Sequence, residues 1–337
     1  MLKLERTIQT IDAHTGGEPL RIVTAGLPPL RGATILDRRA DAQARFDGLR
    51  RFLMLEPRGH ADMYGAYLLP PVTARADFGV IFIHNEGYSD MCGHGIIALG
   101  KALVELGMVE RASPETRVGF DSPAGFIEAF VEWDGERAGR VRFLCVPSFI
   151  LARDVRVETP GFGTLSVDVV FGGAFYAYLD GAQAGLPVRP ERVADLVRLG
   201  DEVKHAVDRV MAVRHPLEPG LDALYGTVID GPAPDGSPAH QANVCVFADR
   251  QVDRSPTGTG TAGRVAQLFL RGRLGLGETF VNESVTGSRF QARVVARAKV
   301  GDLDAVVPEV SGEAHLMGMH QWVLERDDPF AEGFLLR

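Results

Sequence analysis

The chain has 337 residues, 45% of them hydrophobic, and a formal net charge of -8. This length predicts roughly two domains, and the hydrophobic fraction is sufficient for a core in each. The acidic balance and the lack of a Lys/Arg block argue against nucleic acid as a partner, and no apolar run is long enough to span a membrane. The first residues lack the apolar core of a signal peptide, so we expect a cytoplasmic protein.

In chain order, the first half is predicted to mix strands with helices. Period-two alternation and β-rich composition favour strands, whereas apolar residues at three- and four-residue spacing favour helices. A proline or glycine stop signal follows each predicted helix. The expected strands are 4–11, 20–25, 78–83, 125–133 and 140–146, and the expected helices are 36–55 and 94–106.

The second half repeats this mixture after a predicted linker at 151–154. Its clearest element is an amphipathic helix over 191–213, which we expect to have a packing role. A last helix is expected to be capped by Ser255, with Pro256 at its first position. The expected strands are 167–171, 174–179, 242–247, 280–297 and 304–310.

Two Gly-rich turns share one design. Each follows a predicted strand, contains one chemically distinctive residue and opens a predicted helix. The first turn holds Cys92, and Thr257 occupies the corresponding place in the second, about half the chain length later. This repetition predicts two similar α/β halves facing each other, with a site in the cleft between them.

The first turn suits a reactive thiol that acts on a small acid. A helix N-terminus favours the thiolate form of a cysteine and also binds carboxylates. Gly93 and Gly95 let the backbone approach a ligand, and His94 offers a donor nearby. The alternative for Cys92 is a small buried core residue. Three cysteines cannot all pair and they lack metal-type spacing, so we expect neither disulfides nor a zinc site. Cys145 and Cys245 lie in β-rich apolar runs and are assigned to the core.

The second turn supports a ligand site less strongly by itself. Its Gly258-Thr259-Gly260-Thr261 run lacks the lysine of a phosphate loop, so a nucleotide is not expected. Asp253, Ser255 and Thr257 are also ordinary capping residue types, which leaves a purely structural role as the alternative. The roles of the loop histidines His14, His60 and His240 are left open.

Several motifs together resemble the proline racemase family over nearly the whole chain. They are His14-Thr15-Gly16-Gly17-Glu18-Pro19, Arg58-Gly59-His60, Met91-Cys92-Gly93-His94-Gly95, and Asp253-Arg254-Ser255-Pro256 followed by Gly258-Thr259-Gly260-Thr261. The resemblance implies an α/β (α+β) fold like that of diaminopimelate epimerase, with two domains that each curl a sheet around a central helix. It also implies chemistry without a cofactor or metal. The implied domains are 1–152, carrying Cys92, and 153–314, carrying Asp253 and Thr257, with the segment from about 315 returning to the first.

Thr257 decides which activity the resemblance implies. Racemases and epimerases of this family carry a second cysteine in its place, and an alcohol is too weak an acid or base to replace that thiol. Members with threonine are similar to trans-3-hydroxy-L-proline dehydratases, which implies dehydration of an imino acid with Cys92 as the acceptor of the α-proton. By the same resemblance the substrate is held by Gly93, His94, Asp253, Gly258 and Thr259, and Phe247 forms a wall of the pocket.

Three other functions are weighed against dehydration. The first is a proline racemase or hydroxyproline 2-epimerase in which water replaces the missing thiol. The second is a binding protein that captures an imino acid without reaction. The third is a cysteine hydrolase, which is disfavoured because His94 next to Cys92 does not define a triad. The sequence leaves the oligomeric state open, a homodimer included.

Overall fold

The computed structural model describes residues 4–336, which form two compact units. Unit 1 comprises the residues up to Met91, Gly95–Val141 and the residues from Glu313 onward, and unit 2 comprises Cys92–His94 and Arg142–Gly312. The predicted domain limits near 152 and 314 stay predictions. The two compact units of the structure change at 141/142 and 312/313.

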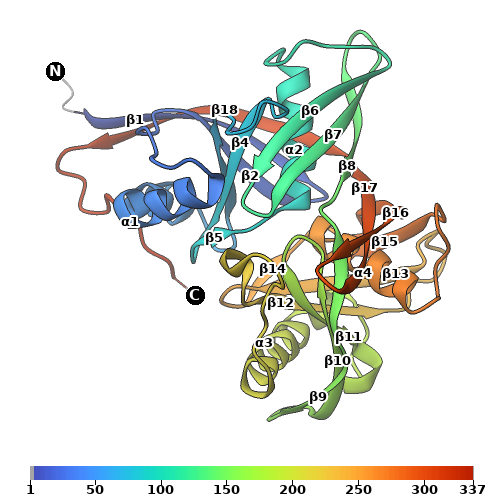
Figure 1. The fold of residues 1–337 in the computed structure, drawn as a ribbon. Coiled ribbons are helices and arrows are strands. Elements are labelled where there is room, and N and C mark those ends of the chain that lie inside the picture. The colour runs from blue at the N-terminus through green and yellow to red at the C-terminus, as the bar shows by residue number, and fades with distance from the viewer. Residues whose placement is uncertain (1–3, 337) are drawn as a thin grey trace. The chain divides into compact units, whose positions relative to one another are not determined.

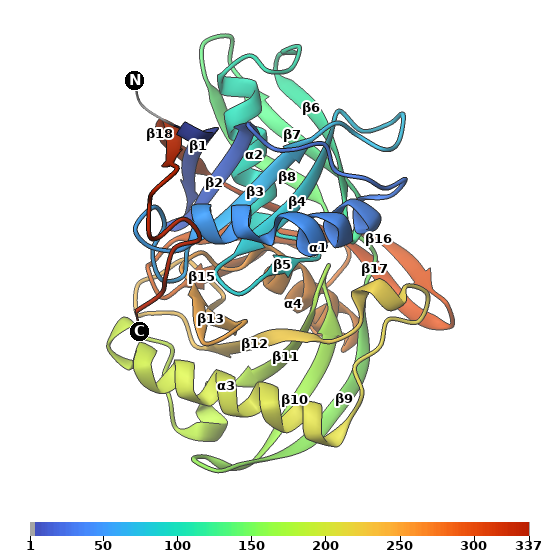
Figure 2. The same cartoon turned by 90° about the vertical axis from the view of Figure 1, so that its left-hand side faces the viewer.

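Unit 1 is a mixed sheet with one helix on each side of it (Figures 1 and 2). Its strands lie in the order β18-β1-β2-β3-β4-β6-β7, parallel at β2/β3 and β4/β6 and antiparallel elsewhere. Helices α1 and α2 lie within the two parallel crossovers, as parallel neighbours require. The elements are β1 (Leu4–Thr15), β2 (Glu18–Ala25), α1 (Ile35–Met54), β3 (Tyr64–Leu69), β4 (Phe78–His84), β5 (Tyr88–Ser89), α2 (Gly93–Glu105), β6 (Glu115–Ser122), β7 (Gly125–Trp133) and β18 (Ala314–Glu325), and β8 (Ala138–Leu144) leads into unit 2.

Unit 2 closes its strands into a ring. The order is β9-β10-β11-β12-β13-β15-β16-β17, and β17 pairs again with β9. Strands β11/β12 and β13/β15 are parallel, with α3 and α4 in their crossovers. The elements are β9 (Ser148–Thr159), β10 (Gly163–Phe171), β11 (Phe175–Asp180), α3 (Val193–Val210), β12 (Leu224–Gly231), β13 (Gln241–Phe247), β14 (Gln251–Asp253), α4 (Gly258–Leu270), β15 (Phe280–Ser284), β16 (Arg289–Val300) and β17 (Leu303–Gly312).

The two units repeat one order of elements. β1-β2-α1-β3-β4-β5-α2-β6-β7 in unit 1 corresponds to β10-β11-α3-β12-β13-β14-α4-β15-β16 in unit 2. In each unit the second helix is the more buried one: α2 is covered along nearly its whole length, and α4 is covered over its first turns. The predicted α/β class, with two similar parts that each hold a central helix, is confirmed.

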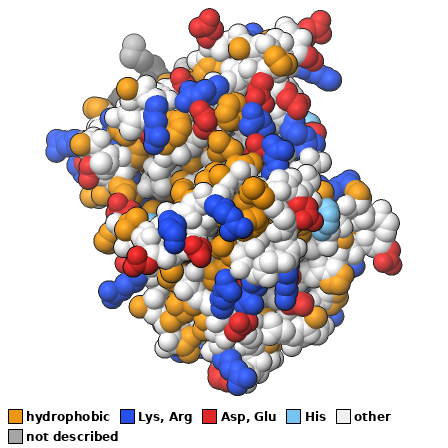
Figure 3. Space-filling view, turned by 45° about the vertical axis from the view of Figure 1, so that its right-hand side comes forward, with side chains coloured by type: hydrophobic (Ala, Val, Ile, Leu, Met, Phe, Trp, Pro, Cys, Tyr) orange, Lys and Arg blue, Asp and Glu red, His pale blue; other side chains and the backbone are white. Residues whose placement is uncertain are grey.

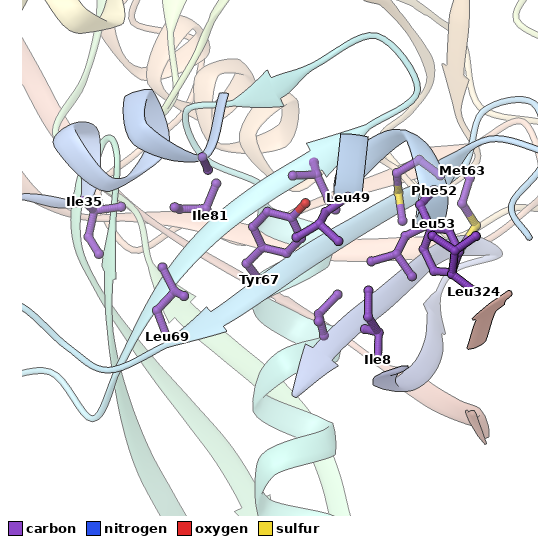
Figure 4. Packing of buried hydrophobic residues seen from close by; sticks show 14 residues of the cluster. Ile8, Ile35, Leu49, Phe52, Leu53, Met63, Tyr67, Leu69, Ile81 and Leu324 are labelled. Atoms are coloured by element: carbon purple, nitrogen blue, oxygen red, sulfur yellow. The ribbon is translucent and has the colours of Figure 1, made fainter. Parts of the chain in front are cut away.

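The outer helix of unit 1 packs on the sheet through an apolar cluster (Figure 4). Leu49, Phe52 and Leu53 of α1 lie against Ile8 of β1 and Tyr67 of β3, and all five are 5% exposed or less. Thr34 begins α1 with a capping box, in which its hydroxyl and the Asp37 carboxylate each accept a backbone N–H of the other residue. The pairing of β1, β2 and β3 under α1 therefore buries one continuous core.

Two predicted details are wrong. Residues 151–154 are not a linker but lie inside β9, which is irregular there because of a register shift against β10 and a φ of +53° at Asp154. Ser255 does not cap the last helix, because α4 begins at Gly258 and Thr257 is the residue before it. The Ser255 hydroxyl instead accepts the Thr257 backbone N–H.

Surface and hydropathy agree with an ordinary globular chain. On the face drawn in Figure 3, Lys and Arg side chains are interspersed with Asp and Glu side chains, so neither sign dominates that face. Within residues 4–336, the helices are all too short or too polar to cross a membrane.

Candidate active site

The starts of α2 and α4 touch each other within unit 2. A Cβ atom added to Gly93 would lie 2.5 Å from the Gly258 Cα, and one added to Gly258 would lie 2.5 Å from the Gly93 Cα. No side chain fits between the two backbones, so both positions require glycine. Cys92 and Thr257 are the residues that immediately precede these two glycines. The two turns that the sequence singles out are thus brought into direct contact.

One ring nitrogen of His94 lies near both a thiol and a carboxylate. Its Nδ1 atom is 3.2 Å from the Cys92 Sγ and 3.8 Å from the Asp253 Oδ2. All three residues are 4% exposed. The other Asp253 oxygen accepts the Ser255 backbone N–H at 2.8 Å, which fixes the carboxylate on the loop before α4. A thiol, an imidazole and a carboxylate therefore form one buried cluster of polar groups.

Thr257 has an unusual backbone conformation. Its φ is +62° and its ψ is 101°, which a β-branched residue rarely adopts. Its hydroxyl oxygen is buried, and no hydrogen-bond partner for it occurs among residues 4–336. A backbone outlier and an unpaired buried hydroxyl at one residue together point to a functional site.

The other predicted residues lie on the elements around α4. Thr259, in the first turn of α4, shares a 2.7 Å hydrogen bond with the Tyr176 hydroxyl. Phe247 ends β13, which pairs with the short strand β14 that carries Asp253. Its ring stacks on Tyr225 with 5.3 Å between ring centroids. Thr259 and Phe247 are 3% and 4% exposed.

Sequence reasoning did not find the tyrosines and amides behind α4. Tyr178 donates to the Gly260 carbonyl at 2.7 Å, and burial raises the pKa of both Tyr176 and Tyr178 well above the usual value, which keeps both hydroxyls protonated. Asn243 and Asn282 reach the loop before α4 from β13 and β15. These residues sit in apolar strand patterns without a motif, so only the pairing of the strands reveals them.

Each of the three loop histidines has a contact within its own unit. The His14 ring lies 5.2 Å from that of His315, and His60 contacts the Ala61 carbonyl. The Nδ1 atom of His240 accepts the Val281 backbone N–H at 2.9 Å. A search of residues 4–336 finds no cluster of three His, Cys, Asp or Glu side chains arranged to hold a metal ion. The prediction of cofactor-free chemistry stays a prediction.

Comparisons with known proteins fit the fold and the turns described above. The family model for proline racemase matches residues 10–335. The chain belongs to the proline racemase family.

Individual relatives carry two different activities in their names. A trans-3-hydroxy-L-proline dehydratase of Burkholderia cenocepacia is 58% identical over 100% of both chains. A 3-hydroxyproline 2-epimerase of Burkholderia multivorans is also 58% identical over 100% of both chains. The crystal structure of a hydroxyproline epimerase from Agrobacterium vitis, with bound trans-4-hydroxy-L-proline, has a TM-score of 0.92 and 32% identity and covers 99% of this chain and 97% of that one. The predicted family and fold are therefore confirmed.

Proposed function

We propose that this protein dehydrates trans-3-hydroxy-L-proline to Δ1-pyrroline-2-carboxylate without a cofactor. The observation that carries the proposal is the asymmetry of the two touching helix starts, with a thiol at Cys92 before one and a hydroxyl at Thr257 before the other. The name of the Burkholderia cenocepacia relative, which is 58% identical over its whole length, supports the same reaction.

Each predicted site residue has a role in the proposed reaction. The backbone N–H groups at the helix starts, including those of Gly93, Gly258 and Thr259, hold the substrate carboxylate, because helix N-termini attract anions. Asp253 pairs with the ring ammonium of the substrate. His94, whose Nδ1 atom lies near both the Cys92 thiol and the Asp253 carboxylate, orients these two groups. Phe247, stacked on Tyr225, forms an apolar wall against the ring.

The elimination uses one thiol twice. The carboxylate and hydroxyl of the substrate are trans, so the α-hydrogen and the leaving hydroxyl lie on the same face of the ring. The Cys92 thiolate takes the α-proton, the electron pair of that C–H bond forms a double bond to C3, and the C3–O bond breaks. The new thiol returns its proton to the departing hydroxide, which leaves as water, and the enamine tautomerises to Δ1-pyrroline-2-carboxylate. N–H groups at both helix starts stabilise the charge that develops on the carboxylate.

Thr257 explains why the second face carries no acid or base. Racemisation requires a proton donor opposite the acceptor, and a threonine hydroxyl does not ionise at neutral pH. Its buried, unpaired hydroxyl can instead hydrogen-bond to the substrate or to a water molecule, which would recover the free energy that an unsatisfied buried hydroxyl costs.

The second candidate is 2-epimerisation of proline or a hydroxyproline. The Burkholderia multivorans relative favours it, since its name is 3-hydroxyproline 2-epimerase at the same 58% identity. In that case a water molecule must deliver the proton on the Thr257 side. A homodimer and a cytoplasmic location stay predictions.

Proton NMR in D₂O distinguishes the two reactions. The purified protein is incubated separately with trans-3-hydroxy-L-proline, trans-4-hydroxy-L-proline and L-proline. Dehydration predicts loss of the first compound to Δ1-pyrroline-2-carboxylate, with the other two unchanged in configuration. Inversion at the α-carbon with deuterium incorporation, and no pyrroline product, would show that the protein is an epimerase and not a dehydratase.

A further inference from the structure

The loop before α4 is held by an unusual concentration of donors on one oxygen. The Pro256 carbonyl accepts hydrogen bonds from the Asn243 Nδ2 at 3.1 Å, the Thr261 hydroxyl at 2.8 Å and the Asn282 Nδ2 at 3.3 Å. We call these three side chains the Pro256 clamp. They are 0%, 0% and 1% exposed, so water does not substitute for them.

The clamp is itself fixed by the fold. Asn243 and Asn282 come from β13 and β15, whose parallel pairing around the α4 crossover sets Asn282 opposite Gln241, two residues before Asn243 on β13. Asn282 also donates to the Thr261 hydroxyl at 2.8 Å and accepts from the Gln241 amide at 3.2 Å. These bonds leave the Asn282 amide little rotational freedom, because each added partner restricts its orientation.

The opposite side of the same peptide is held as well. The Pro256 carbonyl and the Thr257 N–H belong to one planar peptide group, and the N–H donates to the Ser255 hydroxyl at 3.1 Å. With both sides bonded, the peptide plane cannot rotate to relieve the φ of +62° at Thr257. A conformation of this kind persists only where the surroundings over-determine it.

We infer that Asn243, Thr261 and Asn282 are positioning residues for the reaction. By holding the Pro256–Thr257 peptide they keep Thr257 and the first N–H groups of α4 in the geometry the substrate needs. This inference rests on the proposed function for its catalytic consequence, whereas its structural part, the fixed peptide, stands without it. The alternative is that the three side chains only satisfy buried polar groups.

Matched threonine substitutions separate positioning from burial. Thr261→Val removes the hydroxyl that donates to the Pro256 carbonyl and keeps the shape of the side chain. Thr227, on β12 of unit 2, has an equally buried hydroxyl, which donates to the Gly200 carbonyl of α3 at 2.8 Å. Thr227→Val removes this hydroxyl. Thr261→Val should lower kcat by about 10- to 100-fold with little change in KM, since a misplacement near 1 Å costs about that much. Thr227→Val should keep kcat within about 2-fold of the wild-type value. Thr261→Ser keeps a hydroxyl at position 261 and should have a kcat near that of the wild type.

Amide hydrogen exchange tests the clamp without any substrate. The Thr261 N–H donates to the Thr257 carbonyl at 2.6 Å, so exchange across 257–262 reports whether the first turn of α4 stays closed. Thr261→Val should accelerate this exchange by about 10-fold, and Thr227→Val should not. Asn282→Leu provides a second variant if Thr261→Val does not fold. It removes the hydrogen bonds that the Asn282 amide donates to the Pro256 carbonyl and the Thr261 hydroxyl and the one that it accepts from Gln241.

Each result decides one question. If kcat and exchange in Thr261→Val and Asn282→Leu match those of Thr227→Val, the clamp has no positioning role and the inference fails. If the wild-type protein does not dehydrate trans-3-hydroxy-L-proline, the proposed function fails. Faster exchange at 257–262 in Thr261→Val than in the wild type still supports a clamp that fixes the peptide, whereas unchanged exchange in this variant overturns the clamp.

Discussion

Substituting Gly258 by alanine should damage the enzyme although the same change usually stabilises a helix. An alanine in a helix is ordinarily favoured over glycine by about 1 kcal/mol. At Gly258 the added Cβ would lie 2.5 Å from the Gly93 Cα, 2.7 Å from the Gly93 carbonyl carbon and 2.9 Å from the His94 nitrogen. All three are backbone atoms, which cannot rotate away as a flexible side chain does.

The magnitude follows from these distances. Ordinary contact requires the two helix starts to separate by about 1 Å, and a shift of that size at reacting groups costs about 100-fold in rate. Overpacking should also lower the free energy of unfolding by about 1–3 kcal/mol. The assay is kcat/KM for trans-3-hydroxy-L-proline together with thermal unfolding.

Gly48→Ala is the matched control for this change. Gly48 lies inside α1, and its added Cβ would meet only the Glu332 side chain, at 3.2 Å to the Oε1 atom. That side chain is 64% exposed and can move, so this variant should be as active as the wild type and slightly more stable. If Gly258→Ala keeps kcat/KM within about 3-fold of the wild-type value, the close approach of the helices does not control the reaction.

Three further predictions concern the thiols and the residue opposite Cys92. Cys92→Ser should abolish turnover yet bind substrate in calorimetry with nearly wild-type affinity; measurable dehydration by this variant would exclude Cys92 as the base. Thr257→Cys should gain α-carbon inversion, measured by deuterium incorporation from D₂O, because it restores a second acid/base. If this variant only dehydrates, other residues set the outcome. Burial raises the pKa of Cys145 to about 12, so native alkylation at pH 8 should leave Cys145 unmodified by mass spectrometry, and rapid labelling there would contradict its core assignment.

The sequence predicts local features of this fold well where periodicity decides them. Helix α1 was expected over 36–55 and occupies Ile35–Met54, and α2 was expected over 94–106 and occupies Gly93–Glu105. The repeated Gly-rich turns also predicted two similar parts. The helix limits depend on residues within about 20 positions of each other, which is the range over which hydrophobic periodicity is read.

Long-range pairing accounts for what the sequence did not predict. The ring of unit 2 closes through β9 and β17, where Phe149 pairs with Ala305. No local pattern encodes that partner. The start of α4 was also misplaced, because Ser255 and Pro256 match ordinary capping preferences. Tertiary hydrogen bonds to the Pro256 carbonyl override those preferences and move the helix start to Gly258.

For the candidate site, residue types were predictable and their geometry was not. Chemistry and family resemblance selected Cys92, His94, Asp253 and Thr257. The proximity of His94 to both a thiol and a carboxylate follows from contacts between segments about 160 residues apart. The positive φ of Thr257 is held by tertiary hydrogen bonds to the Pro256 carbonyl from β13, β15 and α4. The buried amides of the Pro256 clamp lacked any signal, since asparagine within a strand has no motif.

The pairing of β1 with β18 imposes an order on biosynthesis. Among the strands of the two units, β1 is translated before all the others and β18 after them, yet they pair from Leu4 with Glu325 to Thr15 with Ala314. The main segment of unit 2, Arg142–Gly312, is continuous and is translated between them. It can therefore fold while translation continues, whereas one edge of β1 waits for β18. Unit 1 is thus completed only after the main segment of unit 2 has been translated, and a nascent chain stalled before β18 would expose that edge to aggregation or to chaperones.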